Sequence, residues 1–282
     1  VSFNDLRSGI YSNCTVQVRD AAGNLSAASA VSEFTVDTLL PILRQVVPVA
    51  LVTGDSTPDY TFSSSESGTI IYSGNCSSAD TTADAGDNPI IFNALADGMH
   101  SNCRLRVTDA LGNVSESLDV REFTVDTTAP VLRVVTPVAN PTNDTTPRFT
   151  FMSNENGVIT YGGSGTCASS DVFANDGENW VDLDQLVGGP SFSGCTLTVT
   201  DAAGNASVAL AVNDFTIDVD APVVTEDAPI GSSATAWPAY SFSTTEAGTI
   251  IYGGACADIV VGAVSGSNTI TFRGLDDGIY SN

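Results

Sequence analysis

The stretch Cys14-Thr-Val-Gln-Val-Arg-Asp-Ala-Ala-Gly-Asn24-Leu-Ser26 decides the fold, because the chain contains two further copies of it. The copies run from Cys103 to Asn113 and from Cys195 to Asn205. The alternating Thr-Leu-Thr-Val-Thr of residues 196–200 is typical of a β-strand, and Asp-Ala-Ala-Gly-Asn is typical of a turn. The copies lie 89 and 92 residues apart, counted between their cysteines. That period suits an independent β-sandwich domain and is too long for a solenoid unit.

Two more motifs repeat with a similar period, so the repetition covers the whole chain. The stretch Ser65-Glu-Ser-Gly-Thr-Ile-Ile-Tyr72 returns in related form at 154–161 and 245–252. A Phe-Thr-Val-Asp or Phe-Thr-Ile-Asp motif ends at Asp37, Asp126 and Asp218, and a proline follows each one four residues later. Proline fixes φ and does not continue a central strand, so we place the domain boundaries at these linkers. The predicted domains are two complete immunoglobulin-like repeats, 39–127 and 128–219, preceded by the C-terminal part of a repeat, 1–38, and followed by the N-terminal part of another, 220–282.

The two ends of the sequence carry similar segments. Val1–Asn13 (VSFNDLRSGIYSN) matches Ile270–Asn282 (ITFRGLDDGIYSN). If the last segment of one chain completed the first segment of another, both copies would compete for one position. The overlap therefore favours a section of a longer array over a subunit completed by a second copy.

The composition excludes several classes of function. The chain has 33 acidic and 9 basic residues, all nine of them Arg, and a net charge of −24. Such a chain repels nucleic acid, and without Lys it forms no Schiff base, P-loop or isopeptide bond. The single His, His100, stands where other copies have Tyr11, Phe192 and Tyr280, which predicts aromatic packing rather than catalysis. We expect no enzyme and no membrane span, and a hydrophobic content of 42% is enough for packed cores.

Strand-like runs in the copy 128–219 predict an all-β sandwich of about seven strands. Strand alternation places the turn containing Glu155, the turn containing Asp201 and the linker residue Asp126 at one pole of the domain. The cysteines then fall at the opposite pole, on neighbouring strands. The expected strands are 131–138, 148–152, 158–161, 180–186, 196–200 and 208–217, the last one interrupted, with a short strand inside 168–179.

This placement predicts two disulfides, Cys76–Cys103 and Cys167–Cys195. Each closes a loop of about 27 residues, which contributes on the order of 3 kcal/mol in the chain-entropy model. Cys14 and Cys256 are expected to pair with residues before Val1 and beyond Asn282. The alternative is six free buried thiols, but the regular spacing favours the oxidised form and an extracellular location.

The Cys-Thr-x-x-Val-x-Asp-Ala-Ala-Gly-Asn-x-Ser pattern, followed by Phe-Thr-Val-Asp-Thr-x-x-Pro, resembles the bacterial immunoglobulin-like repeats of large secreted surface adhesins. The resemblance covers the whole chain. It implies a stalk of similar domains in a cell-surface context, often with Ca²⁺ at the junctions. The cysteine pair is a departure from simple members of such families, and the resemblance does not say what the distal end of the protein binds.

The acidic residues at the predicted pole make interdomain Ca²⁺ the sharpest site hypothesis, because Ca²⁺ prefers six to eight oxygen ligands. The alternative is that Asp and Asn simply form turns and Glu faces water. The candidate ligands are Asp37, Glu66, Asp109 and Asn113 at the first junction, Asp126, Glu155, Asp201 and Asn205 at the second, and Asp218, Asp220 and Glu246 at the third.

Other polar features favour simpler interpretations. Acidic residues at 80–87 and 171–178 are expected to be solvated loops, since the third copy is nearly uncharged there. The six Asn-x-Ser/Thr sequons are mostly turn residues, and the isolated Trp180 and Trp237 do not repeat as a sugar platform would.

The sequence thus predicts a structural spacer of an extracellular adhesin or fibre, with neighbouring repeats of the same or identical chains as partners. Two alternatives stay open, a subunit of a polymeric extracellular filament and a carbohydrate-binding accessory module of a secreted enzyme.

Overall fold

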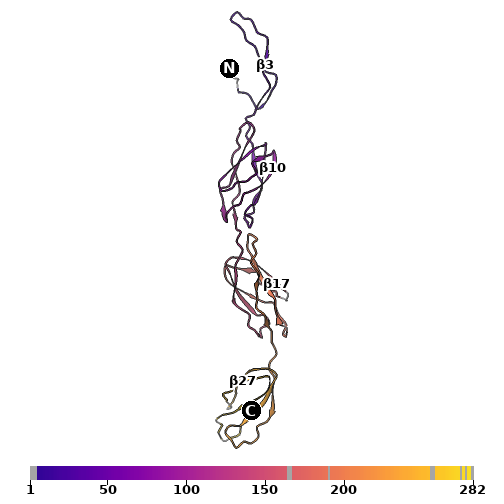
Figure 1. The fold of residues 1–282 in the computed structure, drawn as a ribbon, viewed down its shortest axis with the longest axis vertical. Helices are drawn as coiled ribbons and strands as arrows, with labels where there is room; N and C mark the ends of the chain where they lie inside the picture. The colour runs from indigo at the N-terminus through magenta and orange to yellow at the C-terminus, as the bar shows by residue number, and fades with distance from the viewer. Residues whose placement is uncertain are drawn as a thin grey trace. The chain divides into compact units, whose positions relative to one another are not determined.

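The computed structural model describes residues 5–163, 167–189, 191–254, 258–273, 275–276 and 278–280. The described residues are all-β, with strands joined by turns and no helix (Figure 1). They form two compact units, which do not follow the predicted domain boundaries, so those boundaries stay predictions. The first unit comprises Val1–Pro137, Arg148–Leu183 and Ser193–Asn213, and the second comprises Val138–Pro147, Asp184–Phe192 and Asp214–Asn282.

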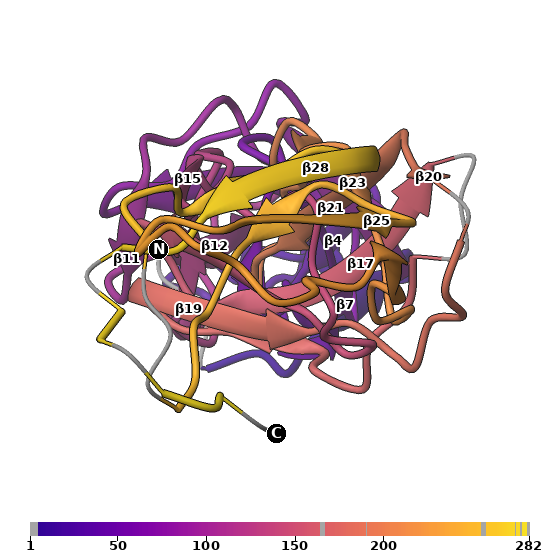
Figure 2. The ribbon, with the colours of Figure 1, turned by 90° about the horizontal axis from the view of Figure 1, so that it is seen from below.

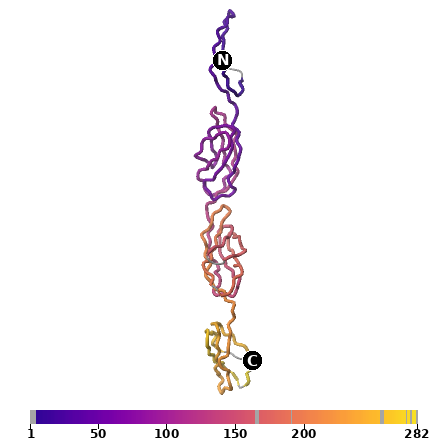
Figure 3. Tube along the Cα trace, turned by 90° about the vertical axis from the view of Figure 1, so that its right-hand side faces the viewer, coloured from indigo at the N-terminus to yellow at the C-terminus, as the bar shows by residue number. Residues whose placement is uncertain are grey.

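Residues 5–38 contribute a single hairpin, drawn in indigo in Figure 3. Its four strands pair as β1 (Gly9–Tyr11) with β4 (Phe34–Val36) and β2 (Thr15–Val16) with β3 (Ser29–Ala30). At the tip, the Asp20 carboxylate accepts hydrogen bonds from the backbone N–H groups of Ala22 (2.9 Å) and Asn24 (2.8 Å). Gly23 has a φ of 96°, which glycine adopts without steric cost. The repeated Asp-Ala-Ala-Gly-Asn motif is therefore a turn whose shape is set by its own Asp and Gly.

Residues 39–127 form a sandwich of sheets in the first unit. One sheet has the order β10-β7-β5, a second has the order β13-β12-β8-β9, and a third has the order β11-β14-β6, in which β14 and β6 are parallel. The strands are β5 (Leu43–Val47), β6 (Val52–Thr53), β7 (Asp59–Ser64), β8 (Gly68–Ser73), β9 (Thr82–Ala83), β10 (Gly86–Ile91), β11 (Gly98–His100), β12 (Arg104–Thr108), β13 (Leu118–Asp119) and β14 (Phe123–Val125).

One hydrophobic core joins these sheets, because every second residue of the central strands points inward. Tyr60 and Phe62 of β7 and Leu105 and Val107 of β12 are completely buried and belong to the same core cluster. His100 is also buried and stacks on Phe123 with ring centroids 5.3 Å apart. Equivalent residues in other copies stack at the same distance, Tyr11 on Phe34 and Phe192 on Phe215, so the predicted packing role of His100 is confirmed.

The first unit also contains two sheets of the following copy, with orders β15-β16-β19 and β18-β17-β21-β22. Their inward positions are again buried, for example Phe151 on β16 and Leu197 on β21. The strands are β15 (Leu132–Thr136), β16 (Arg148–Ser153), β17 (Gly157–Gly163), β18 (Phe173–Ala174), β19 (Gly177–Asp182), β21 (Cys195–Thr200) and β22 (Leu210–Ala211).

One expected strand lies at a different position from the observed one. The sequence predicts residues 180–186, whereas β19 spans Gly177–Asp182. Asn179 lies inside this strand, where its buried amide donates to the carbonyls of Asn175 and Gly177. Leu183 and Leu186 are buried without belonging to a strand, so their hydrophobicity reflects core packing of a loop.

The second unit holds five strands of residues 220–282 and one short pair from the preceding copy. Strands β25 and β28 run side by side in Figure 2, in the sheet β24-β25-β28. The strands are β20 (Ser191–Phe192) paired with β23 (Phe215–Thr216), then β24 (Val224–Ala228), β25 (Ala239–Thr244), β26 (Gly248–Thr249), β27 (Gly262–Ala263) and β28 (Gly266–Thr271).

The structure contains the two disulfides that the sequence predicts. Cys76 is bonded to Cys103 with Cα atoms 5.1 Å apart, and Cys167 to Cys195 with Cα atoms 5.7 Å apart. Cys14 is a half-buried free thiol, and Cys256 lies outside the described residues. Such bonds form and persist in oxidising compartments. No helix in the described part of the chain has the length and hydrophobicity needed to cross a membrane.

Candidate metal centres

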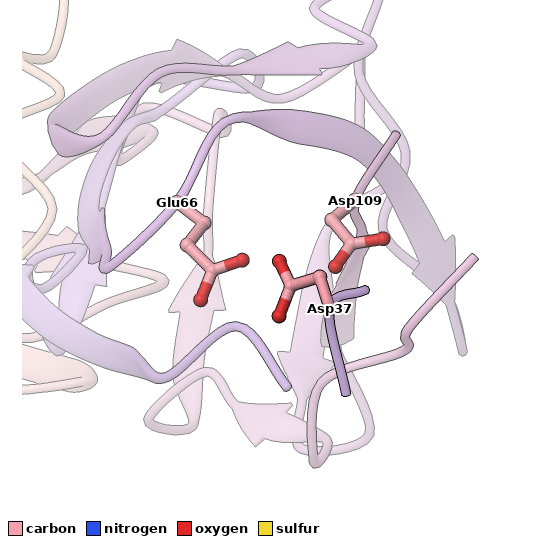
Figure 4. Close-up of side chains that lie close together, drawn as sticks. All are labelled: Asp37, Glu66 and Asp109. Atoms are coloured by element: carbon pink, nitrogen blue, oxygen red, sulfur yellow. The ribbon is translucent and has the colours of Figure 1, made fainter. Parts of the chain in front are cut away.

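Two groups of three carboxylates gather in the first unit. The first carboxylate cluster is Asp37, Glu66 and Asp109, and the second is Asp126, Glu155 and Asp201; in each, one oxygen per residue lies within 4.8 Å of the others. Figure 4 shows the side chains of the first cluster converging on a shared space. All six residues are half-buried. Each cluster combines the linker before a repeat with two turns of that repeat, as strand alternation predicts.

The third carboxylate of each cluster opens the repeated Asp-Ala-x-Gly-Asn turn. The Oδ1 atom of Asp109 accepts from the backbone N–H groups of Leu111 (2.8 Å) and Asn113 (2.9 Å). Asp201 Oδ1 accepts in the same way from Ala203 and Asn205, both at 2.8 Å. These bonds fix the direction of each carboxylate relative to its strand.

The Asn that closes the turn attaches the turn to the linker. Asn113 Nδ2 donates to Asp109 Oδ2 (2.7 Å) and to the backbone carbonyl of Asp37 (3.2 Å). Asn205 Nδ2 donates to Asp201 Oδ2 (2.9 Å) and to the carbonyl of Asp126 (2.7 Å). The sequence predicts that each Asn adds an oxygen ligand. In the structure it is the amide nitrogen of each Asn that contacts the turn aspartate and the linker carbonyl. The Asn side chains therefore position the two Asp residues of each cluster.

The glutamate of each cluster is held by the turn between two core strands. Ser64 at the end of β7 donates its hydroxyl to the backbone carbonyl of Glu66 at 2.6 Å. Ser153 makes the same bond to Glu155, also at 2.6 Å. Both serines are buried, so the backbone of the glutamate is anchored while its side chain reaches the other carboxylates.

The negative charge of the clusters has visible electrostatic effects. Partial burial raises the pKa of Glu155, and the charges of Asp126, Asp201 and Asp176 raise it further. The Asn113 side-chain amide, aided by backbone N–H groups, lowers the pKa of Asp109. The ion pairs seen among the described residues use Asp119, Asp182 and Asp258 instead of the cluster carboxylates. The clusters therefore concentrate negative charge without a protein cation beside it.

The third predicted group is only partly assembled. Asp218 Oδ1 accepts from the backbone N–H of Asp220 at 3.2 Å, as the linker Asp residues of the other junctions accept from the residue two positions on. No further Asp-Ala-Ala-Gly-Asn motif follows Glu246 in the sequence. Among the described residues, Asp218, Asp220 and Glu246 do not join a three-carboxylate group.

Sequence reasoning missed one residue at the second junction, Gly54. Its backbone N–H donates to the carbonyl of Ala203 at 3.0 Å, and a Cβ atom there would lie 2.7 Å from Asn205 Oδ1. The turn that carries Asp201 thus packs directly on the loop after β6, and a larger residue at position 54 would require the Asn205 side chain to shift. The one feature of the sequence that could have indicated this role is the residue type, since the next copy has Asn143 at the position of Gly54.

Two aspartates of the loops expected to be solvated have structural roles. Asp80 Oδ2 accepts from Ser78 Oγ and from the backbone N–H of Ile91, both at 3.3 Å. Asp171 Oδ2 accepts from the backbone N–H of Asp182 at 3.0 Å. These carboxylates fasten their loops to the neighbouring strand, which corrects the expectation for these two residues.

Comparison with known proteins assigns no family, since neither a family model nor a curated protein matches the chain. Among solved structures, it is similar to the D00-D0 domain of intimin at 15% identity and a TM-score of 0.30, over 64% of this chain and 100% of that one. Invasin, a bacterial integrin-binding protein, gives 16% identity and a TM-score of 0.33, over 84% of this chain and 55% of that one. The Bacteroides ovatus protein SGBP-B of a mixed-linkage glucan utilization locus, solved with a heptasaccharide, gives 16% and 0.20, over 78% and 56%. The chain spans about half the length of the last two, and function must be inferred from the geometry.

Proposed function

We propose that this chain is a spacer segment of an extracellular, cell-surface adhesin or fibre, stiffened by Ca²⁺ at the junctions between its repeats. The observation that supports this function is the pair of carboxylate clusters. Each one includes a linker aspartate and two turn residues of the following repeat. A cation bound to all three would tie the linker to the domain.

The chemistry of the clusters favours calcium among common metals. The gathered ligands are carboxylate oxygens, with no imidazole or thiolate among them, which suits a hard cation. Ca²⁺ binds oxygens at about 2.3–2.6 Å, so two ligands of one ion lie up to about 5 Å apart. The observed limit of 4.8 Å is compatible with a single shared ion. Backbone carbonyls and water would complete the shell.

The second junction supports the stiffening role most directly. Asn205 holds the carbonyl of Asp126, and the backbone N–H of Asp126 donates to the carbonyl of Thr53 at 2.9 Å. Gly54 contacts the Asp201 turn as well. The linker therefore has protein contacts on both sides. In the absence of a cation, three carboxylates at this distance repel one another. We propose that a bound Ca²⁺ neutralises this repulsion and holds the linker against the two turns of the following repeat.

The composition supports a solvated, extracellular setting for this role. The two disulfides fit an oxidising compartment, and a net charge of −24 disfavours self-aggregation and nucleic-acid binding.

Small-angle X-ray scattering of the chain in millimolar Ca²⁺ and in chelator tests the function. We expect a smaller maximum dimension and a more flexible scattering profile in chelator. The double variant Glu66→Gln, Glu155→Gln should give the chelator profile in both buffers. A variant of two exposed acidic residues outside the clusters, Glu33→Gln with Glu122→Gln, is the matched control and should respond like the parent chain. Identical profiles of the parent with and without Ca²⁺ would disprove the stiffening role.

A further inference from the structure

The linker of the second junction is also held by a side chain of the repeat that precedes it. Asp97, directly before β11, accepts three hydrogen bonds from this linker. The donors are the backbone N–H of Thr127 at 3.1 Å, the Thr127 hydroxyl at 2.9 Å and the Thr128 hydroxyl at 3.2 Å. One carboxylate therefore attaches two consecutive linker residues to the body of residues 39–127.

This attachment is separate from the second carboxylate cluster. Asp97 is not one of the three carboxylates of that cluster, and its side chain is exposed. The backbone N–H of Asp126 also donates to Thr53 of the preceding repeat, so the linker is held on this side at adjacent residues. The hydrogen bonds from the linker, that of the Thr127 hydroxyl first, lower the pKa of Asp97, so its carboxylate stays ionised at neutral pH. The bonds on this side therefore need no cation.

The first junction has a weaker form of the same contact. Asp97 lies three residues before the stacked aromatic ring of its copy, His100, and Ser8 lies three residues before Tyr11. Ser8 Oγ accepts from the backbone N–H of Thr38 at 3.0 Å and forms a second hydrogen bond with Thr38 Oγ1 at 3.1 Å. A neutral hydroxyl thus makes two bonds where the carboxylate makes three.

The third junction has no side chain at this position. Gly189 lies three residues before Phe192, which stacks on Phe215 as the other rings do. The linker residue equivalent to Thr127 is Val219, which has no hydroxyl to donate. The three linkers therefore differ in how the preceding repeat can hold them through this one position.

We propose that Asp97 is a positioning residue that orders the second linker without a cation, and that the residue at this position sets the metal-free order of each linker. Bonds to a carboxylate are stronger than bonds to a hydroxyl, so the second linker should be held most firmly, the first less firmly and the third least. The contact does not depend on Ca²⁺, and only its use in stiffening a spacer rests on the proposed function.

Hydrogen exchange at the backbone amide of Thr127, followed by nuclear magnetic resonance on the full chain in chelator, tests this role. Asp97→Ala should speed the exchange about fivefold or more, because the N–H loses its acceptor and opens to water. Asp97→Ser supplies a shorter and neutral acceptor and should give an intermediate rate. The sequence neighbours of Thr127 are the same in each variant, so its intrinsic exchange rate is unchanged. Because chelator removes any cation, the result is independent of whether the carboxylate clusters bind Ca²⁺.

Two controls separate a local role in the linker from a general effect. Asp84→Ala removes another exposed carboxylate of the same repeat and should leave the exchange at Thr127 unchanged. The amide of Val107, in the buried part of β12, reports on the folding of the repeat and should exchange at one rate in all variants. Equal rates at Thr127 in the parent and in Asp97→Ala would overturn the proposal. Equal acceleration at Thr127 and Val107 would also overturn it, because Asp97 would then stabilise the whole repeat instead of its linker.

Discussion

The two carboxylate clusters use the same three positions of the repeat but differ in their surroundings. The second cluster has a fourth carboxylate, Asp176, acting on Glu155, and the first copy has Ala85 at the position of Asp176. The repeated motif therefore gives the ligand set, while a residue outside the motif determines how crowded with negative charge each site is.

The largest effect is expected when one carboxylate is removed from each cluster in turn. Asp201→Asn should weaken Ca²⁺ binding at the second site, and Asp109→Asn at the first, each by on the order of 100-fold. The reason is that each aspartate supplies charge to one cluster only. Isothermal titration calorimetry should show the loss of one site in each variant.

Both single variants keep a hydrogen-bonding side chain at the turn, so the turn itself should persist. Loss of both sites in either single variant would show that the clusters are not independent. An unchanged titration would exclude that cluster as a calcium site.

The next largest effect should come from Gly54→Ala, which tests the contact between the loop after β6 and the Asp201 turn at the second junction. A Cβ atom would approach Asn205 Oδ1 to 2.7 Å and the carbonyl of Ala203 to 3.1 Å. We expect a loss of about 1–3 kcal/mol, as for other overpacked sites, measured by calorimetric unfolding in Ca²⁺. Gly231→Ala is the control, because a Cβ there meets nothing within 4 Å. Equal free energies of unfolding for the two variants would show that the close packing at Gly54 does not contribute to the stability of the junction.

The smallest effect concerns the pH dependence of the metal-free protein. The pKa of Glu155 is raised above its ordinary 4.5, so its contribution to stability is complete below that value and is lost as the pH rises through the raised pKa. In chelator, Glu155→Gln should therefore stabilise the chain slightly at neutral pH, by less than about 0.5 kcal/mol, and not at pH 4. Thermal unfolding at the two pH values checks this. A variant less stable than the parent at neutral pH would contradict the assigned repulsion.

The repeat itself made much of the fold and site predictable. Alternation along residues 196–200 predicted a core strand, and strand parity predicted the pole at which Asp126, Glu155 and Asp201 come together. Details that depend on tertiary contacts could not be predicted from the sequence. The role of Gly54 depends on a turn about 150 residues away, and the amide direction of Asn205 depends on the carbonyl of Asp126. The start of β19 was missed because Asn179 is buried with its amide satisfied, which propensity alone cannot show.

The disulfides have a consequence for a repeat pulled from its ends. The cysteines are separated by 27 residues in one copy and 28 in the next, and the segment between them cannot extend while the bond holds. At about 3.3–3.6 Å per extended residue, roughly 90–100 Å of contour length is withheld from each unfolding event. A reducing environment would release that length. Redox state thus limits how far an opened repeat lengthens under load, independently of how strongly it resists opening.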